Sequence, residues 1–330
     1  MHRTMHLPTS VLRLSESRAG RRFAISFLFP TAHPGPGRPG PGPRPDDLLP
    51  FRRRRRRGTL CSVDGKRKFY LVRVGVLLFV LFFVVLYAIR DVRSRRARND
   101  WRAPVNVAIV VVHVAGTEPV EPEALLAFRA RAPALADRLA AEAERIHPGI
   151  VRPFRFTVFG PVEAGTAAPQ PASDGVVDLV KQAWRQNRWL AGVDPAAGVV
   201  TDQWDTRIYV EARKPASVKR SFVEGLSQEG GRIGIVAVEL DPSMADFTLF
   251  VVAHELLHTL GATDKYDANG FALDPSGLAE PDRVPKYPQR FAEVMARNRP
   301  LTADREAVPA VLGELAVGGL TAQEIGWRRP

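Results

Sequence analysis

The sequence predicts a mixed α/β domain that follows a single membrane-spanning helix. Two observations predict this fold class. Short apolar runs rich in valine and isoleucine alternate with longer segments in which leucine and alanine recur at helical spacing. A separate run near the N-terminus is apolar on every face and is bracketed by arginine. A third observation, a strongly apolar helix that carries two histidines, indicates a candidate active site within the domain.

Each element of the domain is predicted from its own pattern. Residues 105–112 form a continuous apolar, β-branched run, which is typical of a strand buried on both faces. Residues 123–147 carry leucines and alanines at helical spacing, despite a proline at position 133. The other predicted elements are strands at 155–159, 207–212 and 233–240, a helix at 176–190, and a last helix that begins near Thr321 and ends at Gly326-Trp327.

Two histidines four residues apart, His254 and His258, lie in the apolar segment 247–260. On a helix this spacing puts both imidazoles on one face, within reach of one zinc ion, with Glu255 offset by one residue. Zinc hydrolases need three protein ligands and an open position for water, whose pKa the metal lowers to about 7. Glu255 is the expected general base, which takes the proton of this water and passes it to the leaving amine. The motif therefore predicts metal-assisted hydrolysis of an amide bond.

The third zinc ligand must come from beyond this helix. Gly261 suits a positive φ that ends the helix and returns the chain to the metal, which brings Asp264 near the histidines. Glu280 is the alternative, because other zinc peptidases take a glutamate from a second helix downstream. Two prolines and a glycine near Glu280 argue against a helix there. We expect His254, His258 and Asp264 to bind Zn²⁺.

These residues resemble the metzincin zinc peptidases, whose extended signature has a glycine three residues and a third ligand six residues after the second histidine. Most members have histidine at the last position, whereas Asp264, followed by Lys265-Tyr266, resembles the snapalysin-type branch. The family also has a methionine turn beneath the metal, for which Met295 is the candidate; ordinary core packing is the alternative. The resemblance implies a mixed twisted sheet, an active-site helix and zinc-dependent endopeptidase activity.

The resemblance also has implications for substrate binding. In this family the strand before the zinc helix is a sheet edge that pairs with the extended substrate, and residues 234–238 would be its counterpart. An ordinary interior strand is the alternative. Tyr266 or Tyr287 would donate a hydrogen bond to the tetrahedral oxyanion, or would serve only as packing.

The apolar run near the N-terminus covers residues 69–89, with Arg73 as its only charged residue. As a helix it spans about 30 Å, the thickness of the hydrocarbon layer, which favours a membrane span over a buried core helix. Residues 1–68, rich in proline, glycine and arginine, are expected to be disordered, and residues 90–103 to form a basic linker before the peptidase domain, residues 104–330.

The net charge of +12 is distributed unevenly. Residues 1–103 contain 23 lysines and arginines against 6 acidic residues, whereas residues 104–330 contain 24 against 29. The predicted domain is mildly acidic, which argues against a nucleic-acid partner. The flanking segment 52–68 contains nine basic residues and the segment 90–102 contains six, so the positive-inside rule favours a cytoplasmic N-terminus and an extracytoplasmic domain. The one cysteine, Cys61, precedes the apolar run, which leaves the domain without a disulfide.

The sequence thus predicts a membrane-anchored zinc metallopeptidase that hydrolyses a protein or peptide substrate and contacts lipid through residues 69–89. Gly261, Tyr266 and Met295 would support its site. Two hypotheses of other classes stay open. One is a catalytically inactive, membrane-tethered binding module with the same fold. The other is a basic lipid- or nucleic-acid-binding membrane protein whose histidine motif is accidental.

Overall fold

The computed structural model describes residues 63–170, 175–216, 223–227 and 230–328. Cys61 and all but the last six of residues 1–68 lie outside the described residues. The helices are α1 (Val63–Arg98), α2 (Pro122–Ile146), α3 (Val176–Ala197), α4 (Ala245–Thr259) and α5 (Gly319–Glu324). The main strands are β1 (Val105–Val114), β2 (Phe154–Ala164), β3 (Thr206–Arg213), β4 (Val223–Ser227) and β5 (Ile233–Glu239).

Helix α1 is long and apolar enough to cross a membrane, judged by its length and composition. Its apolar side chains are exposed, as with Phe69, Leu77 and Phe82 at 59–70%. Among the described residues, this segment is therefore not a buried core helix. The helix is longer than the predicted span, residues 69–89, at both ends, because the flanking lysines and arginines are themselves good helix formers.

The domain is built around a five-stranded sheet of order β2-β1-β3-β5-β4. Neighbours among the first four strands are parallel, and β4 runs antiparallel to β5. Parallel strands require crossover connections. Helix α2 connects β1 to β2, and α3 connects β2 to β3 on the other side of β1. This arrangement confirms the predicted mixed α/β fold class.

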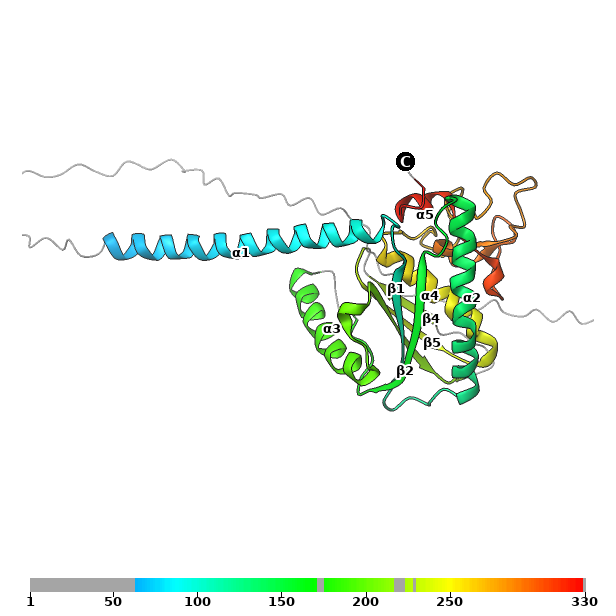
Figure 1. Ribbon diagram of the computed structural model, residues 1–330, viewed down its shortest axis with the longest axis horizontal. Helices are drawn as coiled ribbons and strands as arrows, with labels where there is room; N and C mark the ends of the chain where they lie inside the picture. The colour runs from blue at the N-terminus through cyan, green and yellow to red at the C-terminus, as the bar shows by residue number, and fades with distance from the viewer. Residues whose placement is uncertain (1–62, 171–174, 217–222, 228–229, 329–330) are drawn as a thin grey trace, which may run out of the picture. The chain divides into compact units, whose positions relative to one another are not determined.

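Helices cover both faces of the sheet. Val107 and Ile109 of β1 pack with α2 and α4 in one apolar cluster, whereas the intervening Ala108 and Val110 pack with α3 in another. Figure 1 shows α3 on one side of the sheet and α2 and α4 on the other. Because both faces are covered, β1 reads as a continuous apolar run rather than an alternating one.

Two expectations about strands need correction. The edge-strand hypothesis for residues 234–238 is wrong, because β5 lies inside the sheet between β3 and β4. Strand β4 is the edge instead, and it escaped prediction because its five residues include a glycine and two polar residues. Strand β2 continues past its predicted end at Phe159. A register shift opposite Val111 accommodates Gly160, whose φ is 83°, and pairing with β1 resumes beyond it.

The segment that joins α1 to the sheet packs into the domain rather than forming a free linker. Arg98 is 7% exposed and donates hydrogen bonds to the carbonyls of Gly230, at 3.1 Å, and Gly231, at 2.7 Å. Trp101 donates to the carbonyl of Ile325 at 2.8 Å. The predicted domain boundary at residue 104 therefore leaves out side chains that hold the domain's other segments.

The chain after α4 is mostly irregular. It contains short paired strands, β6 (Ala292–Glu293) with β9 (Leu315–Ala316) and β7 (Arg299–Pro300) with β8 (Glu306–Ala307). Helix α5 begins two residues before the predicted start at Thr321. Two segments of this region, around residues 264 and 294, lie against α4 and complete the site described next.

Candidate metal centre

Helix α4 carries both histidines of the motif. It follows a short 3-10 turn, Pro242–Met244, in which the carboxylate of Asp241 accepts a hydrogen bond from the backbone N–H of Ser243. The helix is buried along most of its length, and His254 and His258 are 7% and 9% exposed. As the four-residue spacing predicts, the two imidazoles lie side by side, with 3.1 Å between their Nε2 atoms.

Gly261 ends the helix as the sequence predicts. Its φ is 99°, its N–H donates to the carbonyl of His258, and the N–H of Ala262 donates to the carbonyl of Leu257. These two hydrogen bonds form a Schellman motif, which requires the left-handed conformation that glycine adopts without strain. The chain reverses here, and Ala262 turns its carbonyl toward His258.

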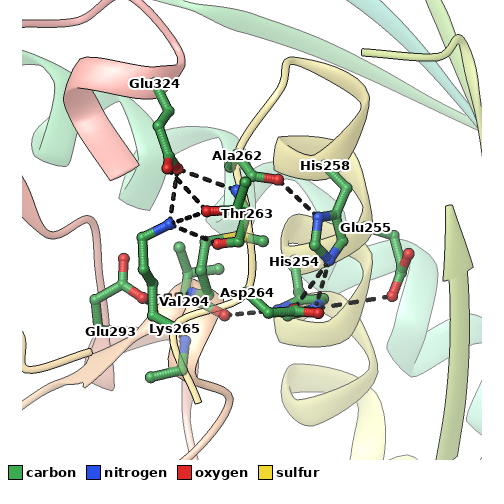
Figure 2. A network of polar contacts seen from close by, with 12 residues as sticks. His254, Glu255, His258, Ala262, Thr263, Asp264, Lys265, Glu293, Val294 and Glu324 are labelled. Carbon is green, nitrogen blue, oxygen red and sulfur yellow. Dashed lines mark hydrogen bonds and ion pairs between the residues drawn. The ribbon is translucent and has the colours of Figure 1, made fainter. Parts of the chain in front are cut away.

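The reversal brings Asp264 to the histidines. Its Oδ1 lies 3.4 Å from Nε2 of His254 and 3.2 Å from Nε2 of His258. Ligand atoms of the three residues all lie within 4.8 Å of one another, so the group could hold a metal ion. Figure 2 shows the aspartate reaching across to both rings from the loop that follows α4.

The other ring nitrogens fix the tautomers that metal binding needs. Nδ1 of His254 lies 2.9 Å from the carbonyl of Val294, and Nδ1 of His258 lies 2.8 Å from the carbonyl of Ala262. A carbonyl oxygen can only accept, so each Nδ1 carries the proton. Each Nε2 of a neutral ring then presents a lone pair toward Asp264. A carboxylate and two lone pairs at this separation repel one another unless a cation lies between them, so this donor set suits a metal cation.

The same close approach shifts the pKa values of His258 and Asp264. Burial disfavours a charged imidazole, but the hydrogen bond to Asp264 and the negative charges of Glu255 and Asp264 outweigh burial and raise the pKa of His258. Partial burial disfavours the Asp264 carboxylate, yet hydrogen bonds from both histidines hold its pKa far below the usual range. The site is therefore built for a positive charge between these groups.

Glu255 lies beside the three-residue group on the same helix. It is 3% exposed, and its Oε1 is 4.0 Å from Nε2 of His254. Within the described part of the chain, its buried Oε2 has no hydrogen-bond partner. A buried carboxylate oxygen without a donor is costly, and such an atom beside a candidate metal group is placed to accept a proton.

Gly234 of β5 allows Glu255 to approach the sheet. A Cβ at this position would lie 2.7 Å from Cδ1 of Ile208 and 3.2 Å from Cβ of Glu255. We expect Gly234→Ala to lower the free energy of unfolding by about 1–3 kcal/mol, because the extra methyl overpacks the contact between α4 and the sheet. Gly192→Ala is the control, since nothing lies within 4 Å of its added Cβ and alanine favours the helix. Denaturant unfolding measures both, and equal stabilities would contradict this account of the contact.

A turn at residues 293–296 packs against α4 and orients His254. It contains the carbonyl of Val294 that accepts from His254, and Met295 is fully buried within it. The buried carboxylate of Glu293 accepts hydrogen bonds from the N–H groups of Met295 and Ala296 and from the hydroxyl of Thr321. Burial raises the pKa of Glu293, although these hydrogen bonds oppose the shift. Met295 thus lies in a turn next to the site, as expected, and a role beyond packing stays a prediction.

A second polar network holds the loop that carries Asp264. Lys265 is 2% exposed, and its ammonium donates to Glu324 at 2.8 Å, to the Thr263 carbonyl at 2.7 Å and to the Thr263 hydroxyl at 2.6 Å. Glu324 also accepts from the N–H of Thr263 at 3.0 Å and from its hydroxyl at 2.8 Å. The backbone N–H of Lys265 donates to the carbonyl of Met295 at 3.0 Å. Figure 2 shows this network on the far side of the loop from the histidines. The residues on both sides of Asp264 are therefore held in place. The sequence pattern did not predict that Glu324 and Met295 would be their partners.

Tyr266 follows the same loop. Burial and the nearby charge of Asp264, to which its hydroxyl is hydrogen-bonded, raise the pKa of Tyr266 to about 12. The guanidinium of Arg297 lies 5.2 Å from the centre of the tyrosine ring. Among the described residues, no hydrogen bond or ion pair links Tyr287 to the site. Of the two tyrosines that the sequence suggested, Tyr266 is the one with a contact to the three-residue group.

Glu280, the alternative third ligand, is occupied elsewhere. Its carboxylate forms an ion pair with Arg290 and accepts from the backbone N–H of Arg290. The hydrogen bond from the Arg290 side chain lowers the pKa of Glu280. No second helix carries it toward α4 in the described chain, as the prolines nearby predict.

No protein-family model and no curated protein sequence matches this chain. Among solved structures it is similar to the crystal structure of wild-type OgpA from Akkermansia muciniphila, with 13% sequence identity and a TM-score of 0.32. The match covers 66% of this chain and 60% of that one, so this chain spans less than two thirds of OgpA.

Proposed function

We propose that this protein is a membrane-anchored zinc endopeptidase of the metzincin type, in which His254, His258 and Asp264 bind zinc and Glu255 is the general base and then the general acid. One observation carries the proposal: both Nδ1 atoms are hydrogen-bonded to carbonyls, and two Nε2 atoms and a carboxylate converge. Zinc held there would lower the pKa of water to about 7 and polarise the carbonyl of the scissile bond.

The residues of the chain would do the remaining chemistry. Glu255, buried and with no donor to Oε2 among the described residues, accepts a proton from the water whose oxygen adds to the carbonyl carbon. It returns that proton to the amide nitrogen as the C–N bond breaks, which leaves a carboxylic acid and an amine. Tyr266 is the candidate donor to the carbonyl oxygen as charge develops there.

The substrate would lie along the edge of the sheet next to α4. Because β5 is interior, this edge is formed by β4, whose backbone pairs with β5 on one side only. An extended peptide can add to such an edge through backbone hydrogen bonds. The proposal therefore assigns to β4 the role that the sequence suggested for residues 234–238.

The proposed topology has α1 crossing the membrane with the N-terminus in the cytoplasm and the domain outside it. The nine basic residues of segment 52–68 and the six of segment 90–102 support this orientation. Arg98, one of the six, is folded into the domain, so the basic bias toward the N-terminal side is stronger than the sequence count indicates.

The proposal is tested by measuring the zinc content of the purified full chain and its cleavage of a mixed peptide pool. We expect stoichiometric zinc, together with cleavage that a chelator abolishes and added zinc restores. Stoichiometric zinc without any cleavage would support the inactive binding module. A preparation that binds no zinc would overturn the proposal and leave the accidental-motif hypothesis standing.

The ligand set has its own test in Asp264→Ala. We expect zinc affinity to fall by at least about 100-fold, because loss of an outer-shell partner alone typically costs about 10–100-fold. Competition with a chromophoric chelator measures the affinity. Asp282→Ala, at an exposed carboxylate in the following segment, is the control and should bind zinc like the wild type. If the two variants bind zinc equally, Asp264 is not a ligand.

A further inference from the structure

We propose that the exposed face of α3 rests on the surface of an anionic membrane. Val177, Val180 and Trp184 are 66%, 65% and 63% exposed, and their spacing puts them on one side of the helix. The opposite side carries Trp189, which packs against Tyr209 of the sheet with ring centres 5.3 Å apart. The fold thus uses one side of α3 and leaves an apolar stripe on the other.

Cationic side chains border this stripe. Lys181, Arg185 and Arg188 are all exposed, and on a helix they fall beside the three apolar residues rather than opposite them. The guanidinium of Arg188 lies 5.7 Å from the centre of the Trp184 ring. The only carboxylate in this part of the helix is Asp178, 3.9 Å from Lys181. The face is therefore apolar and positively charged at once.

This combination fits a lipid surface with negatively charged headgroups. Tryptophan and arginine are favoured at the boundary between headgroups and acyl chains, and lysine and arginine are attracted to anionic lipid. A neutral apolar partner would offer no counter-charge to Arg185 and Arg188, whereas Lys181 already lies near Asp178.

The chain itself keeps such a surface close to the domain. The apolar run of α1 ends at Ile89, and the next nine residues continue the helix to Arg98, which is bonded to Gly230 and Gly231. Nine helical residues rise about 14 Å. Where α1 spans a membrane, this short connection tethers the domain to it, so a lipid surface is the partner that α3 meets at high local concentration.

The test uses the full chain with Cys61→Ser, reconstituted into vesicles that contain brominated lipid. A fluorophore is attached at Val180→Cys on α3 or, as the matched control, at Leu126→Cys on α2, which is 66% exposed. Vesicles are made of phosphatidylcholine alone or mixed with phosphatidylglycerol. We expect brominated lipid to quench the label at position 180 in the mixed vesicles and not the label at position 126.

Charge reversal supplies the second arm. Lys181→Glu, Arg185→Glu and Arg188→Glu together should lower the ratio of docked to undocked domain by at least about 100-fold, because each cation near an anionic surface contributes about fivefold and each new carboxylate is repelled. Equal quenching at the two positions, or quenching that survives charge reversal, would overturn the proposal. Shielding of position 180 that depends on protein concentration and not on lipid charge would also overturn it, because a second copy of the chain would then cover the face.

Discussion

Glu255→Gln is expected to lower kcat/KM for peptide hydrolysis by about 10²- to 10⁴-fold while zinc stays bound. Glutamine keeps the size of the side chain but cannot accept the proton that Glu255 is proposed to take from water. Glu255 lies 4.0 Å from His254 and is not one of the three converging groups, so the metal affinity should be unchanged. Steady-state kinetics and zinc content, measured on the same preparation, give both quantities.

The control for this variant is Glu280→Gln. Glu280 pairs with Arg290 away from the three-residue group and should leave both rate and zinc content as in the wild type. A Glu255→Gln protein that cleaves peptides at the wild-type rate would contradict the assigned mechanism. Loss of zinc together with activity would show instead that Glu255 belongs to the metal-binding set.

Glu324→Gln is expected to destabilise the metal-free protein by about 3–5 kcal/mol and to weaken zinc binding by about 10–100-fold. The first effect arises because Lys265, 2% exposed, loses its charged partner and stays buried beside neutral acceptors such as those of Thr263. The second arises because Glu324 holds Thr263 and Lys265, the two residues that flank Asp264. Denaturant unfolding with chelator present and chelator competition measure the two effects separately.

The double variant Glu324→Gln with Lys265→Met separates support of the ligand from general stability. Removing both charges should restore much of the stability, because no buried ion is left unpaired, whereas zinc affinity should stay well below that of the wild type. Glu314→Gln is the matched control: Glu314 pairs with Arg299, and its side chain is 23% exposed against 22% for Glu324. Wild-type zinc affinity in the double variant would show that the network does not position Asp264.

The parts of this site that could be predicted from sequence follow local geometric rules. The four-residue spacing of His254 and His258 fixes their common face on any helix, and Gly261 marks the one position where the chain can take a left-handed conformation and turn back. Asp264 follows Gly261 by only three residues, so the chain reversal at Gly261 brings it back toward the histidines.

Contacts between distant segments could not be predicted in the same way. Lys265 and Glu324 are 59 residues apart, and Glu293 and Thr321 are 28 apart, with irregular chain between them. The pattern of charges along the sequence gives no sign of which of many lysines and glutamates will pair. The short strand β4, with its glycine and polar residues, has no strong pattern either, so the edge of the sheet was assigned to the wrong strand.

Spacing within one element or one turn is enough to predict the mixed α/β fold class, the apolar helix and the three side chains that could hold a metal. The packing of distant segments sets which carbonyls orient the histidines, which carboxylate holds the loop of Asp264, and how Arg98 and Trp101 join the domain. The physical reason is that a buried polar group must find a partner wherever the packed chain supplies one, and position along the sequence does not determine that place.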